Sequence, residues 1–219
     1  MGDRALVDHA LDRFVGVTDA VAVNVHHHRP MLESHLAGRV HLSIEEPEAL
    51  GTAGALGKLR EWIDHRPVLV VNGDTYCPSS VSMLLDGWDG ERVRVLVVGG
   101  GVFGPTTEIA GAALPWKEVA TLAPEVSGLY ERSWSRAAQE ARLEVVPLPA
   151  DEICVDCGTP AKYLAANMQW SGGESVIGPG ASVDGTVDQS VIWPGAVVRA
   201  DEHLTRAIRA HERLTVLVR

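Results

Sequence analysis

The sequence predicts an α/β fold, a three-layer Rossmann-like sandwich with a mainly parallel sheet, followed by a short C-terminal left-handed β-helix. Two observations lead to this prediction. Through the first two thirds of the chain, segments with helical periodicity alternate with short apolar runs, an order typical of parallel sheets covered by helices. After residue 169 the apolar residues are spaced mostly six apart and Pro-Gly pairs mark the corners, which indicates short stacked coils.

The α/β domain is expected over residues 1–169. Asp3 is placed to cap a first helix that ends at Gly16, and Thr159 followed by Pro160 marks the start of a last helix that runs to about Met168. Apolar positions at helical or continuous spacing define the elements between them. The expected strands are 20–25, 40–44, 68–71, 92–98, 143–146 and 153–155, and the expected helices are 30–36, 52–64 and 127–141.

The tail is expected over residues 170–219. Residues 175–183 are echoed by residues 190–198, and each copy carries a Pro-Gly corner. About two coils are expected, and so short a stack has to cover its ends against the α/β domain or another subunit. The expected apolar anchors are Ile177, Val183, Ile192, Val198, Leu204, Ile208 and Leu214.

Composition narrows the function classes. The chain of 219 residues is 46% hydrophobic and 22% charged, which is ordinary for a globular protein. A net charge of −10 argues against nonspecific binding to nucleic acid or to anionic membranes. No apolar run approaches the roughly 18 residues of a membrane span, and the first ten residues lack the apolar core of a signal peptide. Three cysteines, an odd number, indicate a reducing compartment, so we expect a cytoplasmic protein.

Asp74 is a candidate metal ligand. It follows the apolar run Val68–Val71 and Gly73, and ligands of parallel sheets bind at the carboxyl ends of the strands. A carboxylate there suits Mg²⁺ on a triphosphate. The alternative is ordinary turn chemistry, since Asn-Gly-Asp is common in turns.

The segment Gly51-Thr52-Ala53-Gly54 begins the expected helix at residues 52–64. Small residues at a helix start allow a phosphate or a base to approach the backbone amides. The alternative is close packing of the helix against the sheet, which Gly54 and Gly57 would also permit.

Three motifs together resemble one family. They are the segment Leu50–Leu56, the segment Val70–Asp74, and Asp156-Cys157-Gly158-Thr159 with Tyr163 to Ala166 beyond. The chain resembles the nucleoside-diphosphate-sugar pyrophosphorylases (sugar-1-phosphate nucleotidyltransferases), and the tail leans toward the mannose-1-phosphate guanylyltransferase-like branch. The resemblance implies an enzyme in which Asp74 and Asp156 are the catalytic carboxylates and hold Mg²⁺, while a nucleoside triphosphate and a sugar 1-phosphate give an NDP-sugar and pyrophosphate.

The resemblance also implies substrate contacts. Gly51, Thr52, Gly54 and Gly73 would bind the nucleotide, and Glu45 or Glu46 would read the edge of the base; we assign this role to Glu45. The family has an N-A-G turn that touches the sugar, and Ile109-Ala110-Gly111 stands in its place, so Gly111 is the sugar-binding candidate.

Two family segments have no counterpart in residues 1–219. These are the N-terminal G-x-G-T-R phosphate loop with its first strand, and the E-K-P segment whose lysine contacts the sugar phosphate. The α/β domain is therefore expected to be truncated at its N-terminus, with the flank of a central strand exposed. Two functions stay open: a nucleotidyltransferase, or a catalytically inactive nucleotide-sugar-binding or regulatory subunit. A homo-oligomer formed through the tail is expected in either case.

Two further motifs have ordinary interpretations. Residues 99–104 fit G-x-G-x-x-G, but Pro105 argues against the helix that a dinucleotide-binding loop requires, so we predict a flexible loop. Cys154-Val155-Asp156-Cys157 is a single C-x-x-C, and a structural zinc needs two more ligands, so a reduced pair is the default expectation.

Overall fold

The computed structural model describes residues 1–2, 4–100, 103–212 and 214–218. The expected helix cap Asp3 and residues 101–102 of the glycine-rich run lie outside this part of the chain.

The chain divides into two compact units that interleave in sequence. Unit 1 comprises Met1–Asp12, Asn72–Ser79 and Glu152–Arg219, and unit 2 comprises Arg13–Val71 and Ser80–Asp151. The expected domain boundary at residue 169 stays a prediction. No helix among the described residues is both long enough and apolar enough to cross a bilayer.

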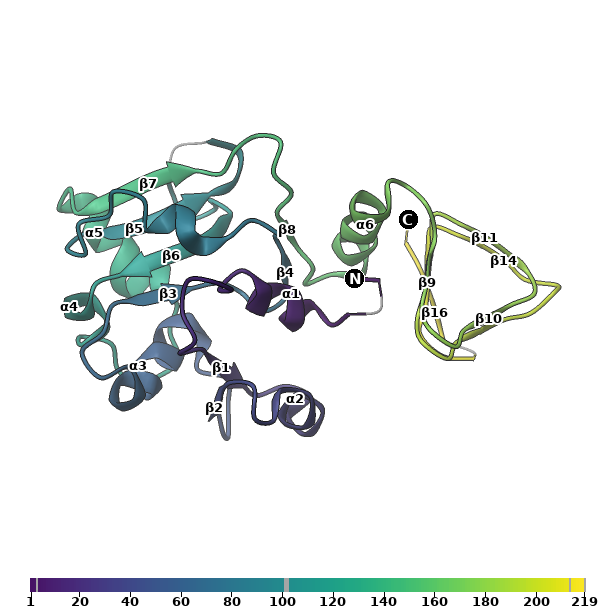
Figure 1. The fold of residues 1–219 in the computed structure, drawn as a ribbon, viewed down its shortest axis with the longest axis horizontal. Coiled ribbons are helices and arrows are strands. Elements are labelled where there is room, and N and C mark those ends of the chain that lie inside the picture. Colours follow the sequence, from purple (N-terminus) through teal and green to yellow (C-terminus); the bar gives the residue numbers. More distant parts are fainter. Residues whose placement is uncertain (3, 101–102, 213, 219) are drawn as a thin grey trace. The chain divides into compact units, whose positions relative to one another are not determined.

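Unit 2 holds a four-stranded sheet in the order β3–β6–β5–β7 and a separate parallel pair, β1 with β2 (Figure 1). Strand β6 runs antiparallel to both of its neighbours and β5 is parallel to β7, so β3, β5 and β7 point the same way. The fold is thus mixed α/β with one reversed strand. The strands are β1 (Ala22–Val25), β2 (His41–Ile44), β3 (Val68–Val70), β5 (Val93–Val97), β6 (Ile109–Leu114) and β7 (Leu143–Pro147).

Helices of unit 2 cover one face of the four-stranded sheet. Apolar side chains of α3, among them Leu56 and Ile63, pack with Val95 of β5 and Leu114 of β6 in one buried cluster. Val119 of α4 joins the same cluster, so this face is closed by helices. The helical elements are α2 (Arg29–Leu36), α3 (Gly51–Ile63), α4 (Trp116–Val119), α5 (Ser135–Gln139), the 3₁₀ turns η1 (Val81–Leu84) and η2 (Val98–Gly100), and the π-helical turn η3 (Tyr130–Trp134).

The strand expected at residues 68–71 is β3, which lies at the end of its sheet among the described residues, with only its flank toward β6 paired. Two expectations for this sheet need correction. A mainly parallel sheet was expected, but β6 runs antiparallel to both of its neighbours, and of the described pairs in this sheet only β5 with β7 is parallel. The expected turn at Ile109-Ala110-Gly111 is part of strand β6. Gly111 lies in a tight place there, because a Cβ on it would be 3.3 Å from both Leu84 and the Val70 carbonyl oxygen.

Unit 1 contains α1 (Leu6–Asp12), the short antiparallel pair β4 (Thr75–Tyr76) and β8 (Val155–Asp156), and helix α6 (Pro160–Ser171). A buried cluster of Met1, Tyr76 and Ala166 holds these elements together. Segments far apart in sequence therefore share one small core, which fixes β4 and β8 against α6.

The C-terminal coils, defined as β9 to β16, stack short strands in three parallel ladders (Figure 1). The ladders are β9–β12–β15, β10–β13 and β11–β14, and β16 closes the first one in antiparallel fashion. The strands are β9 (Val176–Ile177), β10 (Ser182–Val183), β11 (Thr186–Asp188), β12 (Val191–Ile192), β13 (Val197–Val198), β14 (His203–Thr205), β15 (Ala207–Arg209) and β16 (Thr215–Leu217).

Not every expected anchor points into the coils. Ile192, Val198 and Leu204 do, and they form a buried cluster with Ala207. Ile208 instead packs toward Leu164 of α6. The reason is the register: Ile208 pairs with Val191, which also packs toward Leu164, whereas the inward-facing Ile192 pairs with Arg209.

Two other expected anchors are exposed. Ile177 in the first coil and Leu214 after the last are 53% and 54% exposed. These residues lie at the two ends of the stack, where no further coil covers them.

Candidate functional site

The two aspartates expected to bind metal are brought together by β4 and β8. Thr75 pairs with Asp156 across this ladder, and the backbone amide of Cys157 donates to the carbonyl oxygen of Asp74 over 2.9 Å. The backbone of Asp74, in the turn just before β4, thus lies beside that of Asp156 in β8, within unit 1. That they share a metal site stays a prediction.

Local contacts fix the Asp156 carboxylate. Its Oδ1 accepts a hydrogen bond from the Gly158 amide over 2.8 Å, and its Oδ2 accepts one from the Lys162 ammonium over 2.9 Å. The Lys162 ammonium, followed by the Gly158 amide, holds the pKa of Asp156 below its usual range. Gly158 has to be small, because a Cβ would lie 3.0 Å from Oδ1.

Helix α6 begins directly after this aspartate. Thr159 has an extended backbone, and its Oγ1 accepts a hydrogen bond from the Lys162 amide over 3.3 Å, while Pro160 takes the first helical position. A threonine cap followed by proline is a strong helix start. The cap therefore positions both Asp156, just before the helix, and Lys162, in its first turn.

Asp74 has a different environment. It lies in the turn that leads into β4, and among the described residues no hydrogen bond or ion pair engages its exposed carboxylate. Gly73 before it is open, since nothing lies within 4 Å of where its Cβ would be. The turn and metal interpretations are therefore compatible, because the turn presents the carboxylate to solvent beside β8.

The donor set fits one kind of metal ion. Among the described residues there is no group of three or more His, Cys, Asp or Glu side chains placed to hold a metal. Asp74 and Asp156 supply two carboxylates, and Mg²⁺ is typically held by one or two carboxylates together with water and substrate phosphates. The pair thus fits Mg²⁺ and does not form a four-ligand zinc cage.

The neighbouring cysteines are thiols. The described residues include all three cysteines and no disulfide joins them. The Cys157 thiol donates to the Val155 carbonyl oxygen over 3.5 Å, and burial raises its pKa. The pair around Asp156 is therefore reduced, and Cys157 is a poor nucleophile at neutral pH.

The structure separates the two candidate glutamates. Glu45 is 1% exposed, and its Oε2 accepts a hydrogen bond from the Leu50 amide over 2.8 Å. Its other oxygen, Oε1, is buried without a hydrogen-bond partner among the described residues. Glu46 points to the surface and pairs with Arg29. Glu45 is therefore the residue held at the start of α3.

The start of α3 is held by a loop that sequence reasoning missed. The Ala53 amide donates to the Ser127 carbonyl oxygen over 3.0 Å, and the Leu129 amide donates to Thr52 Oγ1 over 3.1 Å. In return, the Ser127 amide donates to the Leu50 carbonyl oxygen over 2.9 Å. Part of the hydrogen-bonding capacity of this helix terminus is therefore used within the protein.

The α3 glycines pack against that same loop. A Cβ on Gly54 would be 2.2 Å from the Glu125 carbonyl oxygen, and one on Gly57 would be 2.4 Å from Ala123. Gly51 has φ of 70°, and its Cβ would be 2.6 Å from the Ser127 carbonyl oxygen. These glycines do allow close packing, but the packing on the sheet named in the alternative is wrong, because the partner is the loop 123–127. The nucleotide contacts of these glycines stay a prediction.

The expected site residues divide between the units. Gly73, Asp74 and Asp156 lie in unit 1, whereas Glu45 and the start of α3 lie in unit 2, as does Gly111. Lys162 was not singled out from the sequence. Its signal was a basic residue at the third position of a helix that starts four residues after Asp156.

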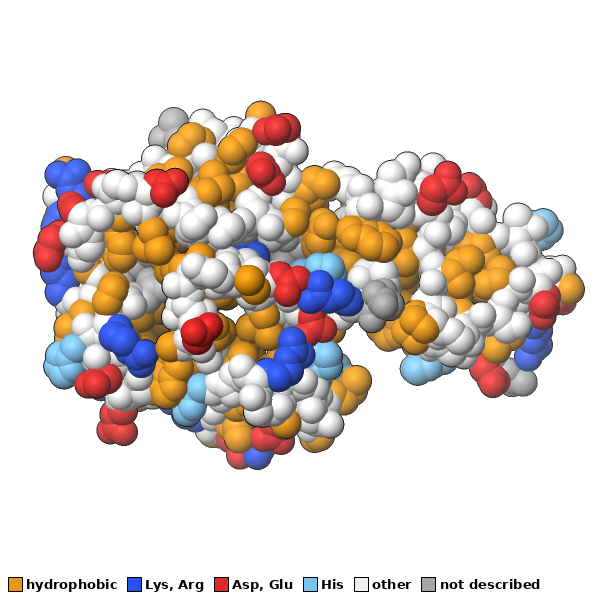
Figure 2. Space-filling view, in the orientation of Figure 1, with side chains coloured by type: hydrophobic (Ala, Val, Ile, Leu, Met, Phe, Trp, Pro, Cys, Tyr) orange, Lys and Arg blue, Asp and Glu red, His pale blue; other side chains and the backbone are white. Residues whose placement is uncertain are grey.

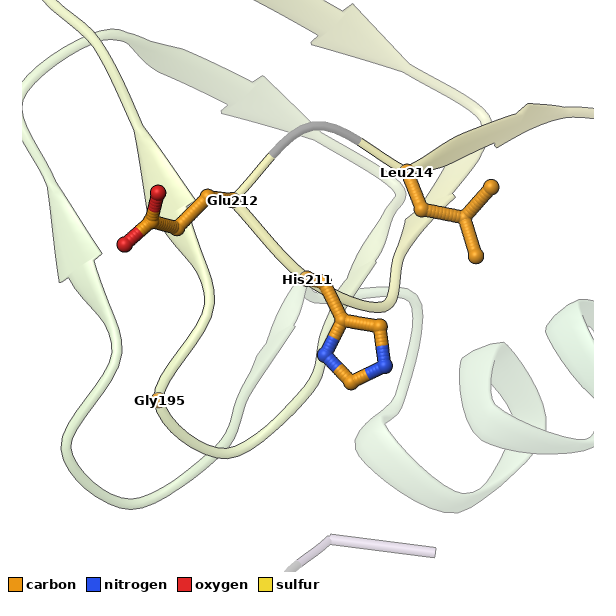
Figure 3. A pocket seen from close by; sticks show the side chains of 4 residues that line it. All are labelled: Gly195, His211, Glu212 and Leu214. Atoms are coloured by element: carbon orange, nitrogen blue, oxygen red, sulfur yellow. The ribbon is translucent and has the colours of Figure 1, made fainter.

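A shallow depression in the C-terminal coils does not form a second chemical centre. It is lined by Gly195, His211, Glu212 and Leu214. Figure 3 shows the His211 and Glu212 side chains pointing away from one another. In the described part of the glycine-rich run, residues 99–100 belong to the 3₁₀ turn η2 and residues 103–104 lie outside any helix.

Comparisons with known proteins agree with the fold and the motifs. No protein-family model matches the chain. Over 121 residues it is 31% identical to the N-acetylmuramate alpha-1-phosphate uridylyltransferase of Caulobacter vibrioides, which covers 49% of this chain and 48% of that protein. The match thus spans about half the length of this curated relative.

Two solved structures share the fold. One is a mannose-1-phosphate geranyltransferase from Thermus thermophilus, with a TM-score of 0.65 and 13% identity over 98% of this chain and 85% of that chain. The other is a candidate glucose-1-phosphate thymidylyltransferase from Bacillus anthracis, with a TM-score of 0.60 and 13% identity over 75% of this chain and 81% of that one. The predicted resemblance is confirmed in fold, and in sequence across about half of the chain.

Proposed function

We propose that this chain, which resembles the sugar-1-phosphate nucleotidyltransferases in fold and motifs, joins a nucleoside triphosphate to a sugar 1-phosphate and releases pyrophosphate. The observation that carries the proposal is the backbone hydrogen bond that sets Asp74, just before β4, beside the end of β8, where Gly158 holds the Asp156 carboxylate ahead of α6. The uridylyltransferase relative supports the same reaction class.

Asp74 and Asp156 are the residues that would hold Mg²⁺. The ion, when bound, neutralises phosphate charge that develops as the leaving group departs. The chain's own contribution is to fix the two carboxylates, through the β4–β8 ladder and through the Gly158 amide. A phosphate oxygen of the sugar 1-phosphate attacks the α-phosphorus, and the bond to pyrophosphate breaks. No proton has to move, so positioning and charge account for the catalysis.

Nucleotide recognition is proposed for Glu45, Gly51, Thr52, Gly54 and Gly73. The buried Oε1 of Glu45 supports this role, because a buried carboxylate oxygen without a partner favours an N–H donor such as the edge of a base.

Sugar binding is proposed for Gly111. The curated relative is named for uridylyl transfer to N-acetylmuramate 1-phosphate, so UTP and that sugar phosphate are the first pair to test. GTP with mannose 1-phosphate is the second pair, because of the mannose-1-phosphate guanylyltransferase-like tail.

The C-terminal coils are proposed to be a left-handed β-helix that joins copies of the chain. Their three parallel ladders support the first part. Exposed apolar side chains at Ile177, Trp193 and Leu217 support the second, and Figure 2 shows apolar side chains gathered on the coils. A cytoplasmic location fits the three thiols.

The test is release of pyrophosphate by the full-length protein with Mg²⁺ and a panel of nucleotides and sugar 1-phosphates. Asp74→Asn and Asp156→Asn should each lower kcat/KM by at least about 100-fold, since a lost metal ligand removes several kcal/mol of charge stabilisation. Asp201→Asn changes an exposed carboxylate in the coils and serves as the matched control.

Folded wild-type protein that releases no pyrophosphate with any pair would contradict the proposal. Binding of a nucleotide sugar without release would favour the inactive binding subunit instead.

A further inference from the structure

Lys162 occupies the place on Asp156 where a cation would bind. Its ammonium lies 2.9 Å from Asp156 Oδ2, while Oδ1 accepts the Gly158 amide. Both oxygens of this carboxylate therefore have partners within the chain. The Asp74 carboxylate has no such partner among the described residues. Before a metal binds, one expected ligand is therefore paired within the chain and the other is not.

The contact between Lys162 and Asp156 is exchangeable. Their side chains are 45% and 48% exposed, and exposed ion pairs contribute little to an equilibrium. A divalent ion on Asp156 would carry twice the charge of the ammonium and would repel it at this short range. The ammonium is on a flexible four-carbon stem and can turn to a nearby anion.

The surroundings of Lys162 favour a phosphate as that anion. Lys162 lies in the first turn of the twelve-residue helix α6, where the aligned amides favour negative charge. The chain has two other lysines, Lys58 and Lys117, and both lie in unit 2 with partners of their own, the Ile44 carbonyl oxygen and Glu91. Lys162 is thus the lysine of the unit that holds both aspartates.

We propose that Lys162 is a phosphate-binding residue that exchanges partners: it pairs with Asp156 before the metal binds and with substrate or product phosphate afterwards. This inference rests on the proposed function. Without metal, the Lys162 ammonium neutralises the Asp156 carboxylate. Once the metal ion has bound Asp156, the same ammonium supplies a positive charge to the phosphates. No bond is made or broken in this step.

Two binding measurements on the full-length protein test the exchange without any turnover. The first is titration with Mn²⁺ alone, followed by electron paramagnetic resonance. Lys162→Met keeps the apolar stem and removes the charge, and it should bind Mn²⁺ about two- to fivefold more tightly, the range expected for loss of one exposed ion pair. The second is calorimetric binding of inorganic pyrophosphate at saturating Mn²⁺. Here Lys162→Met should bind about tenfold more weakly, because one charge-assisted hydrogen bond is lost.

Two variants are the controls. Lys162→Arg keeps the positive charge and should stay near wild type in both titrations. Lys117→Met removes an exposed lysine of the same kind, paired with Glu91 in unit 2, and should change neither affinity. Opposite changes of the two affinities in Lys162→Met alone would support the exchange, since a merely structural lysine would not produce them.

The outcomes separate this inference from the function on which it rests. Wild-type protein that binds Mn²⁺, together with a Lys162→Met variant whose two affinities are unchanged, would overturn the exchange and leave the metal site intact. Wild-type protein that binds no Mn²⁺, with or without pyrophosphate, would overturn the metal site and the exchange with it.

Discussion

Replacing Gly54 with alanine tests the packing of helix α3 most directly. By helix propensity alone, Gly→Ala inside a helix stabilises by about 1 kcal/mol. The structure predicts the opposite sign, because the new Cβ would lie 2.2 Å from the Glu125 carbonyl oxygen and 2.9 Å from the Leu50 Cβ. The first neighbour is backbone, so it cannot be relieved by a rotamer change, and overpacking of this kind costs about 1–3 kcal/mol.

A contact this short belongs at the upper end of that range, so the net destabilisation should be about 1–2 kcal/mol. For a chain of this size that corresponds to a fall in Tm of about 2–8 °C. The assay is thermal unfolding followed by circular dichroism. Gly73→Ala is the control, since no atom lies within 4 Å of its Cβ position and its Tm should be unchanged. A rise in Tm for Gly54→Ala would refute the packing argument.

Two further predictions concern stability. Burial alone would raise the pKa of Glu118, but bonds from Arg142 and Arg136 outweigh it and hold that pKa below the ordinary 4.5. This carboxylate therefore stabilises the fold above about pH 4.5, and its contribution is lost as the pH falls through the lower folded value. As the pH falls below 4.5, the free energy of unfolding measured with urea should decrease more steeply for wild type than for Glu118→Gln. Equal pH dependence of the two proteins would contradict the assignment. In the coils, Ile192→Ala should cost about 2–5 kcal/mol because Ile192 is 1% exposed. The equivalent Ile177→Ala should cost under about 1 kcal/mol, and equal losses of Tm would show that Ile177 is covered.

Secondary structure with a clear local pattern was predictable. The helix expected at residues 52–64 is α3 (Gly51–Ile63), and the start of α6 at Thr159–Pro160 is where the cap and the proline place it. Strand β6 was not predicted, because its alanines and glycine have low strand propensity. Its position depends on packing instead, with Gly111 fitting closely against Leu84.

Features set by long-range contacts could not be predicted from the sequence. The loop 123–127 lies against the α3 glycines, and nothing in either segment alone identifies the other as its partner. In the coils, the six-residue spacing from Ile192 correctly gave Val198 and Leu204, but Ile208, four residues after Leu204, does not follow it and packs toward α6. A spacing rule also cannot foresee the longer corner between Val198 and His203, which changes the pairing interval from fifteen residues at Val183 to seventeen at Val187.

The difference between Asp156 and Glu45 shows which parts of a site can be predicted from the sequence. The Asp156 carboxylate is held by the next six residues: Gly158 leaves room for Oδ1, Thr159 starts the helix, and Lys162 reaches Oδ2. A motif of this kind can be recognised in the sequence because the residues that set its geometry are close together along the chain. The backbone pairing of Asp156 with Thr75 is long-range. Glu45 is oriented by the loop before α3 and by burial beneath other segments, so Glu45 and Glu46 could be separated only by the fold. Asp156, proposed as a metal ligand, therefore lies in the segment where motif and local structure can be compared residue by residue, and Lys162 belongs to the same segment.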